Sequence, residues 1–285
     1  MNPPIHTHRI LNLGAGVQSS TLYCMAVKGL LQFDCAIFAD TQEEPGEVYR
    51  HLEYLKTLGG PVIHVVTQGK LGEDLIRGTN SKGQQKRGGR FASIPAFTAM
   101  RDGEKLGIVR RQCTSEYKIK PIERFIRQSI FAIPFGGRVT KNIRCLHFFE
   151  ISLDEVARST RIKANCQDKW RTVLFPLIEM QMTRADCLRW LAANGFAKPP
   201  RSACVFCPFK RDSEWLRLRQ DDPAGWARAV EIDNAIREDG VACNQKMRQK
   251  LYLHSSCIPL SEVHLNDEDR GQLGFWQECQ GMCGN

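Results

Sequence analysis

The sequence predicts an α/β fold: a Rossmann-like, mostly parallel sheet with helices on both faces, followed by a C-terminal helical region that contains cysteines. Short apolar runs of strand length alternate with stretches of helical periodicity, which is typical of βαβ units around a parallel sheet. The first apolar run also ends in a glycine-containing turn that opens a helical pattern. We expect an α/β domain at residues 1–180 and the helical region at residues 181–285.

Three strands and two helices are expected in the first part of the chain. RILNLG is an apolar run of strand length, and a helical pattern follows it directly. DCAIFAD is a second such run, and PVIHVV, introduced by two glycines, is a third. The strands are thus expected at residues 9–14, 34–40 and 61–66, and the helices at residues 16–31 and 45–58.

The middle of the chain continues the alternation. Residues 114–128 have a helical pattern despite Pro121, which marks either a kink or a helix start. Residues 143–151 are strand-like. Ser152 then has the position of a helix N-cap, with Glu155 three residues later, which is the pattern of a capping box.

The chain after the apolar run TVLFPL is expected to be helical. Residues 67–110, earlier in the chain, are less regular. Helical patterns occupy residues 182–195, 213–220 and 224–238.

The composition indicates a soluble globular protein. The 285 residues are 42% hydrophobic and 25% charged, which is ordinary for such a chain. No run of about 18 apolar residues is present to span a membrane. The polar, proline-containing start MNPPIHTHR is unlike a signal peptide. We therefore expect a cytoplasmic protein with no membrane contact.

The net charge favours anionic partners. It is +9, from 40 basic and 31 acidic residues, and suits a nucleotide or a nucleic acid. The densest basic stretch, SKGQQKRGGR at residues 81–90, is rich in glycine. We interpret it either as a solvated loop or as a loop that contacts phosphate.

Twelve cysteines are present, and in a reducing compartment the clustered ones favour metal binding or catalysis over disulfides. Cys24, Cys35 and Cys187 lie in apolar periodic stretches and are expected to be small buried hydrophobes. The CxxC in SACVFCPF is half of a metal site, a redox pair or two apolar residues in a loop. The cysteines that stand out by spacing or neighbours are Cys113, Cys204, Cys207, Cys279 and Cys283.

The turn LGAGVQSST joins the first strand to the first helix. Gly14 and Gly16 let the backbone approach an anion closely. Gln18, Ser19 and Ser20 supply donors at a helix N-terminus, which itself favours phosphate. The turn is neither a Walker A motif nor a GxGxxG motif, and a simple glycine turn with a Ser/Thr cap is the alternative.

This turn resembles the PP-loop of the adenine nucleotide alpha hydrolase superfamily, and more narrowly that of the sulfonucleotide (PAPS/APS) reductase family. Four further stretches resemble family motifs in the same order: IFADTQEEP, RQCTSEYKIKPIE, ISLDEVARST and KWRTVLFPLIEM. The resemblance spans roughly residues 9–285 and makes residues 1–180 a nucleotide-binding domain. The nucleotide-binding residues that it implies are Gly14, Ala15, Gly16, Gln18, Ser19, Ser20, Asp40, Thr41, Arg111, Lys118 and Arg158.

The resemblance also implies a 4Fe–4S cluster held by cysteines. Cys113 has the position of one family ligand, Thr114 replaces the next, and Cys204 and Cys207 match the CxxC. The tail ECQGMCGN supplies a fourth ligand, for which we take Cys283. A zinc site with four cysteines has similar spacing and remains the alternative.

Two further residues are candidates for catalysis. Cys279 lies where the family carries a nucleophilic tail cysteine, although the residues after it differ. Glu155 is either catalytic or a helix-capping carboxylate.

The function that the resemblance implies is sulfur transfer with an adenine nucleotide, either ATP, AMP or PAPS/APS. Val17 and Gln18 replace the lysine and aspartate of ATP-splitting members, which favours the reductase-like branch. We slightly prefer a nucleic-acid acceptor, which suits the charge of +9, with a partner protein that donates sulfur or electrons. The alternatives are a sulfonucleotide reductase that releases sulfite, and a non-catalytic, zinc-stapled module that binds a nucleotide or nucleic acid.

Overall fold

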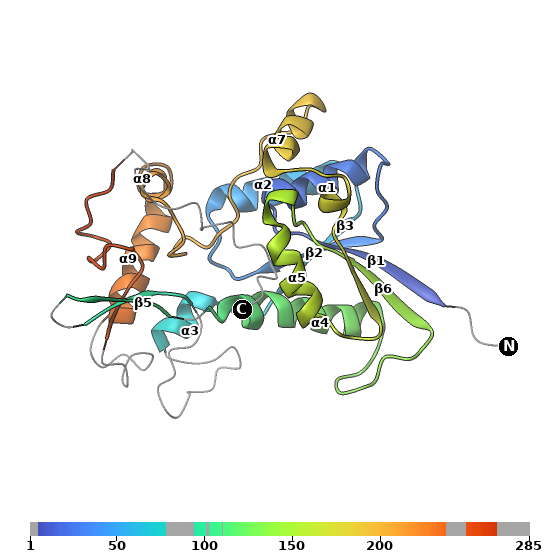
Figure 1. The fold of residues 1–285 in the computed structure, drawn as a ribbon, viewed down its shortest axis with the longest axis horizontal. Helices are drawn as coiled ribbons and strands as arrows, with labels where there is room; N and C mark the ends of the chain where they lie inside the picture. Colours follow the sequence, from blue (N-terminus) through green and yellow to red (C-terminus); the bar gives the residue numbers. More distant parts are fainter. Residues whose placement is uncertain (1–4, 78–93, 101–102, 110, 238–248, 267–285) are drawn as a thin grey trace.

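The computed structural model describes residues 5–77, 94–100, 103–109, 111–237 and 249–266. Its centre is a five-stranded, all-parallel sheet in the order β3-β2-β1-β6-β7 (Figure 1). The strands are β1 (His6–Asn12), β2 (Cys35–Asp40), β3 (Val62–Thr67), β6 (Ile143–Phe148) and β7 (Arg171–Leu174). The predicted Rossmann-like α/β fold is confirmed at this level, and each of these strands overlaps an apolar run in the sequence.

The strand order creates a switch point between β1 and β6. The chain first adds β2 and β3 on one side of β1, and then crosses to add β6 and β7 on the other side. In open α/β sheets, ligands bind outside the carboxyl ends of the strands at such a point. The turn after β1 lies there, at the carboxyl edge of the sheet, as predicted.

Helices cover both faces of the sheet, as predicted. Leu11 of β1 lies in an apolar core with residues of α1 (Val17–Val27), α2 (Gly46–Thr57) and α7 (Arg184–Ala193). Its neighbour Ile10 lies in a different core, because successive side chains of a strand point to opposite faces.

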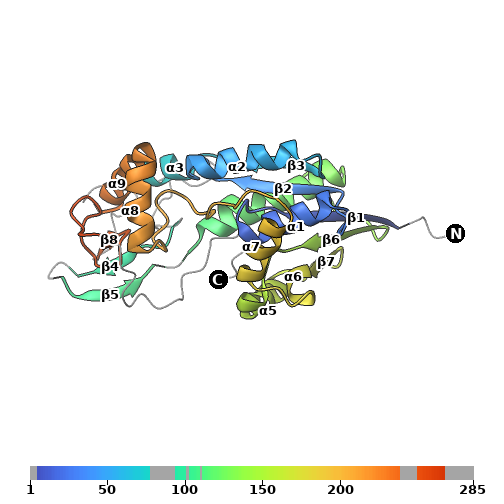
Figure 2. The ribbon, with the colours of Figure 1, turned by 90° about the horizontal axis from the view of Figure 1, so that it is seen from above.

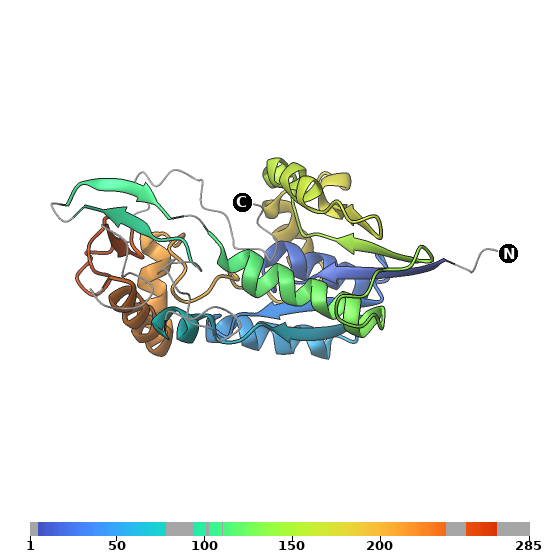
Figure 3. The same cartoon turned by 90° about the horizontal axis from the view of Figure 1, so that it is seen from below.

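The second face is covered by one long helical stretch, green in Figure 3. It consists of the π-helical turn η1 (Thr114–Ile119), α4 (Lys120–Phe125) and a second π-helical turn, η2 (Ile126–Ile130). Ile122 and Ile126 pack with Ile10 in this core. Pro121 lies in the first turn of α4, where its missing N–H is tolerated, so the helical prediction is confirmed.

The segment between β6 and α7 completes this unit. It contains the 3₁₀ turn η3 (Leu153–Glu155), α5 (Val156–Asn165) and α6 (Pro176–Glu179). Ile162 of α5 packs with Val173 of β7 in a small core of its own. None of the described helices is long and apolar enough to cross a membrane.

A second unit lies beside the central sheet (Figure 2). It consists of α3 (Leu71–Arg77), β4 (Phe97–Ala99), β5 (Lys105–Ile108), α8 (Asp212–Asp221), α9 (Pro223–Arg237) and β8 (Lys250–Tyr252). Its three strands form an antiparallel sheet in the order β5-β4-β8. The helices α8 and α9 agree with the sequence. The small sheet was not expected, because its strands are short and the middle one, β4, pairs with β8 from a distant part of the chain.

The two units do not divide the chain at a single position. Cys187 of α7 packs in the core of the central sheet, although α7 follows residue 180. Ile94 and Ala96, which precede that residue, pack in the core of the second unit. The boundary near residue 180 stays a prediction, because packing does not measure which parts fold independently.

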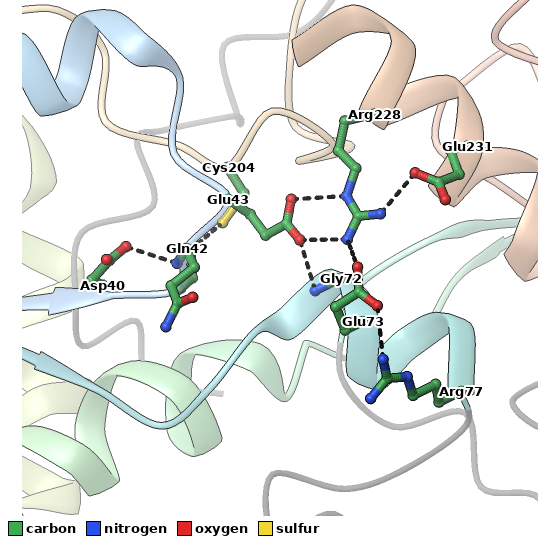
Figure 4. Close-up of polar contacts among 10 residues, drawn as sticks. Asp40, Gln42, Glu43, Gly72, Glu73, Arg77, Cys204, Arg228 and Glu231 are labelled. Carbon is green, nitrogen blue, oxygen red and sulfur yellow. Dashed lines mark hydrogen bonds and ion pairs between the residues drawn. The ribbon is translucent and has the colours of Figure 1, made fainter. Parts of the chain in front are cut away.

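Glu43 connects the two units, as Figure 4 shows. Its carboxylate, in the turn between β2 and α2, accepts hydrogen bonds from Nε of Arg228 in α9 at 3.2 Å and from Nη2 at 2.8 Å. The Gly72 N–H of α3 donates to the same carboxylate at 3.1 Å. One mostly buried carboxylate therefore holds the end of β2 to two helices of the second unit.

Candidate functional site

The turn after β1 has the geometry of an anion-binding loop. Ala15 has φ 57°, a left-handed conformation that turns the backbone sharply into α1. The Gly16 N–H donates to Oγ of Ser19 at 3.2 Å, and that hydroxyl donates back to the Gly16 carbonyl at 3.3 Å. The first turn of α1 carries no acidic residue of its own, so the helix itself supplies no carboxylate at its positive end.

Two buried hydroxyls lie behind this turn: that of Ser20 joins α1 to α2, whereas that of Thr21 bonds within α1. Oγ of Ser20 lies 2.8 Å from Nε2 of His51 in α2, and Oγ1 of Thr21 donates to the Val17 carbonyl at 2.8 Å. Burial lowers the pKa of His51 to about 4, so the ring is neutral near pH 7. The side chain of Ser20 thus binds inside the protein, which leaves backbone N–H groups as the donors that the turn offers a ligand.

Gln18, Glu155 and Arg158 come together beside the turn. Nε2 of Gln18 donates to Oγ of Ser152 at 3.3 Å and to Oε2 of Glu155 at 3.5 Å. Arg158 donates to Oε1 of Glu155 at 2.6 Å, and both side chains are largely buried. The predicted capping box is wrong: Ser152 precedes η3, but its hydroxyl makes no capping hydrogen bond and faces Gln18 instead.

Glu150 and Asn12 also belong to this edge, and the sequence analysis missed both. Nδ2 of Asn12 donates to the two Glu150 carboxylate oxygens at 3.2 and 3.1 Å. A Cβ at Gly14 would lie 3.2 Å from Oε1 of Glu150, so a larger residue there would crowd the carboxyl group. Burial raises the pKa of Glu150 to about 7, although the Asn12 hydrogen bond opposes the shift. The sequence signal that could have found Asn12 and Glu150 is that each is a polar residue at the end of an apolar run predicted to be a strand.

The CxxC loop docks at the carboxyl end of β2. The Val205 N–H donates to the Glu43 carbonyl at 2.7 Å, and Sγ of Cys204 lies 3.2 Å from Oγ1 of Thr41. Oε1 of Glu44 accepts from Nζ of Lys118 at 3.2 Å and lies 3.9 Å from Sγ of Cys204. Thr41, Lys118 and Cys204, predicted from three separate stretches, are therefore brought together.

Asp40 and Arg111 have more peripheral places. The Asp40 carboxylate accepts from the Gln42 N–H at 2.7 Å and from the Tyr49 hydroxyl at 2.8 Å, so it shapes the turn after β2. The Arg111 guanidinium lies 4.4 Å from the centre of the Phe209 ring, next to the CxxC loop.

The described cysteines do not by themselves build a metal site. Cys113, Cys204 and Cys207 contact the same apolar core. Within the described residues, however, no group of three His, Cys, Asp or Glu side chains is arranged to hold a metal ion. Cys279 and Cys283 lie outside the described residues, as does the basic stretch 81–90.

The cysteines expected to be inert are buried. Burial raises the thiol pKa to about 12 in Cys24, about 11 in Cys35 and about 12 in Cys187. These thiols stay protonated near pH 7 and are poor nucleophiles, so their prediction as small hydrophobes is confirmed.

The edge therefore has two sides. On one side the glycine turn presents backbone donors next to a buried carboxyl group and the Glu155–Arg158 pair. On the other side, the buried Lys118 and the thiol of Cys204 both lie next to the Glu44 carboxylate. This arrangement suits the binding of an anion at the turn with thiol chemistry beside it. A scan against protein-family models found no match, and comparisons with curated proteins and with solved structures found none with significant similarity to the chain.

Proposed function

We propose that this protein is an enzyme of the PAPS reductase type that binds an adenine nucleotide and carries out sulfur transfer. The observation that supports the proposal is the convergence of motifs at one sheet edge. The turn after β1 with Gln18 of α1, Thr41 after β2, the Glu155–Arg158 pair after β6, Lys118 of η1 and the CxxC loop all lie at the carboxyl edge or directly against it.

The nucleotide phosphates bind at the turn from Gly14 to Ser20 in this proposal. The backbone N–H groups and the N-terminus of α1 supply the positive field for them. Lys118 and Arg158 are the nearby cations, and each is held in place by a carboxylate, Glu44 and Glu155 respectively. Such pairing keeps a cation oriented before the ligand arrives.

The sulfur step requires a thiolate, for which Cys279 remains our candidate. When a thiolate attacks the sulfonyl sulfur of a sulfonucleotide, a sulfur–sulfur bond forms and the bond from that sulfur to the phosphate oxygen breaks. The electron pair leaves with the nucleotide. A dithiol protein then reduces the sulfur–sulfur bond and releases sulfite. In transfer to a nucleic acid, a sulfur nucleophile instead displaces the leaving group of an activated acceptor carbon.

The 4Fe–4S cluster stays a proposal, with zinc as the alternative. Cys113, Cys204, Cys207 and Cys283 would hold it. Because the described residues do not assemble a ligand group, we derive no step of the reaction through the cluster.

Calorimetry with ATP, AMP, APS and PAPS tests the nucleotide site. Ser19→Ala removes the hydroxyl that holds the Gly16 N–H, and we expect about tenfold weaker binding. Thr57→Ala, which removes an exposed hydroxyl at the end of α2, is the matched control and should bind as wild type does. Failure of the wild-type protein to bind any of the four nucleotides would remove the proposal.

Product analysis separates the candidate reactions. Sulfite released from PAPS or APS in the presence of a dithiol identifies a reductase. Sulfur incorporated into RNA or DNA with ATP identifies transfer to a nucleic acid. Nucleotide binding with neither product would favour the non-catalytic module.

A further inference from the structure

A pocket of about 150 Å³ lies between the N-terminal turn of α2, helix α8 and the segment around the CxxC loop. It is separate from the turn after β1. The residues that matter for its chemistry are Gly46, Arg50, Arg201, Lys210, Glu214 and Arg217.

Lys210 is the buried charge of this pocket. Its side chain lines the pocket, yet the residue is only 9% exposed. Among the described residues it makes no hydrogen bond or ion pair, and its ammonium lies 5.8 Å from the centre of the Trp215 ring. Burial lowers the pKa of Lys210, as does the Arg201 charge, while Cys207 and Glu214 oppose the shift. Because no carboxylate of the described residues pairs with it, this buried ammonium is costly, which indicates that an anionic ligand completes it.

The carboxylates around the pocket do not neutralise Lys210. Glu214 pairs with Arg201 and accepts the Arg211 N–H at 2.8 Å. Asp222 accepts the Gly225 N–H at 2.9 Å. The remaining lining carboxylates, Glu47 and Asp221, are exposed, where water and salt screen them.

Further positive groups surround the opening. Arg50 and Arg217 are exposed residues of the lining. Nη1 of Arg50 lies 3.3 Å from where a Cβ of Gly46 would be, directly over the first turn of α2. That helix has 12 residues, so its N-terminus adds partial positive charge. Donors from three separate elements therefore surround one small cavity, which suits a tetrahedral anion with several acceptor oxygens.

We propose that this pocket binds the phosphate group of a phosphorylated ligand, with Lys210 as the central donor and Arg217 and the N-terminus of α2 as further partners. The inference is independent of the nucleotide site, because it rests on different residues. Inorganic phosphate, a phosphomonoester and a phosphodiester share the chemistry that the pocket recognises.

Calorimetry and thermal unfolding with inorganic phosphate test the proposal, in chloride buffer at constant ionic strength. We expect Lys210→Met to weaken phosphate binding about tenfold or more. In phosphate-free buffer the same variant should have a higher Tm than wild type, because an unpaired buried charge has been replaced by an apolar chain. Lys169→Met removes an exposed lysine and should leave both readouts unchanged.

A second variant and two further ligands complete the test. Arg217→Ala alters only an exposed side chain and should also weaken phosphate binding, so it carries the test if Lys210→Met does not fold. AMP and a short single-stranded oligonucleotide are titrated in parallel into wild type and Lys210→Met. The ligand whose affinity falls more in Lys210→Met identifies the ligand class. The proposal is overturned if wild type binds no phosphate. Phosphate affinity that falls in Ser19→Ala but stays unchanged in both pocket variants would overturn it as well.

Discussion

Glu150 is a buried carboxyl group that lies against the glycine turn. Its residue exposure is 1%, and its two oxygens share the amide of Asn12. Desolvation of the carboxylate raises its pKa, and Glu155 adds to the shift, whereas Arg158 reduces it. Near neutral pH this group therefore exchanges a proton at the edge where we place the nucleotide.

The raised pKa of Glu150 predicts how stability depends on pH. Between its unfolded value of 4.5 and its folded value of about 7, the folded state keeps a proton that the unfolded state loses. The free energy of unfolding therefore falls as pH rises through this window and levels off above it. As pH rises through this window, we expect the free energy of unfolding of wild type to fall by up to about 3 kcal/mol relative to that of Glu150→Gln.

Urea unfolding at pH 4.5, 6 and 8 measures this difference. Glu179→Gln, at an exposed position, is the control and should follow the wild-type curve. If the free energies of unfolding of wild type and Glu150→Gln change with pH in the same way, the prediction is wrong and the pKa of Glu150 is not raised in the folded protein.

At the scale of elements, the turn between β2 and α2 makes several contacts with the second unit. Its Glu43 carboxylate accepts from Arg228 and Gly72, and its Glu43 carbonyl accepts from Val205 of the CxxC loop. The position of the CxxC loop against β2 therefore depends on this turn.

Gly72→Ala should destabilise the protein through this contact. A Cβ at residue 72 would lie well inside contact distance of the Glu43 carboxylate and of the Arg228 guanidinium, so the pair must separate. We expect a loss of about 2–4 kcal/mol in the free energy of unfolding. Gly46→Ala, in the first turn of α2, is the matched control, because its Cβ meets only the flexible end of Arg50. It should change stability by no more than about 1 kcal/mol. Equal unfolding free energies for the two variants would contradict the role of the Glu43–Arg228 pair.

At the scale of the whole molecule, the proposed cluster would join segments far apart in the chain. Cys113 precedes η1, the CxxC follows α7, and both contact the core of the second unit. A metal bound by such segments would stabilise the fold as well as serve chemistry, since it closes long loops.

Anaerobic purification with iron, zinc and sulfide analysis checks this proposal. We expect iron and acid-labile sulfide in wild type, their loss in Cys204→Ser and Cys207→Ser, and a lower Tm for both variants. Cys257→Ser, at a partly exposed thiol outside the proposed set, should retain the metal. Zinc alone in wild type would contradict the cluster but keep the four-cysteine site, and no metal at all would contradict both.

The sequence by itself determined the strands of the central sheet, the main helices between and after them, and the place of the glycine turn. The runs around Ile10, Ile37 and Cys145 are apolar over a strand length, and the connections between them are helical. These patterns are local, and the rule for parallel sheets then places the turn at the carboxyl edge.

Only the tertiary structure decided which polar groups meet. Asn12 and Glu150 are 138 residues apart, and Thr41 and Cys204 are 163 residues apart, so no local periodicity reports their contact. The pairing of β4 with β8 has the same origin, as does the lack of an ion-pair partner for Lys210 among the described residues. Periodicity indicates which face of an element is buried, but the partner of a buried charge depends on how distant elements pack. That packing sets the burial and the pKa of Glu150, and it sets the charge of the pocket around Lys210.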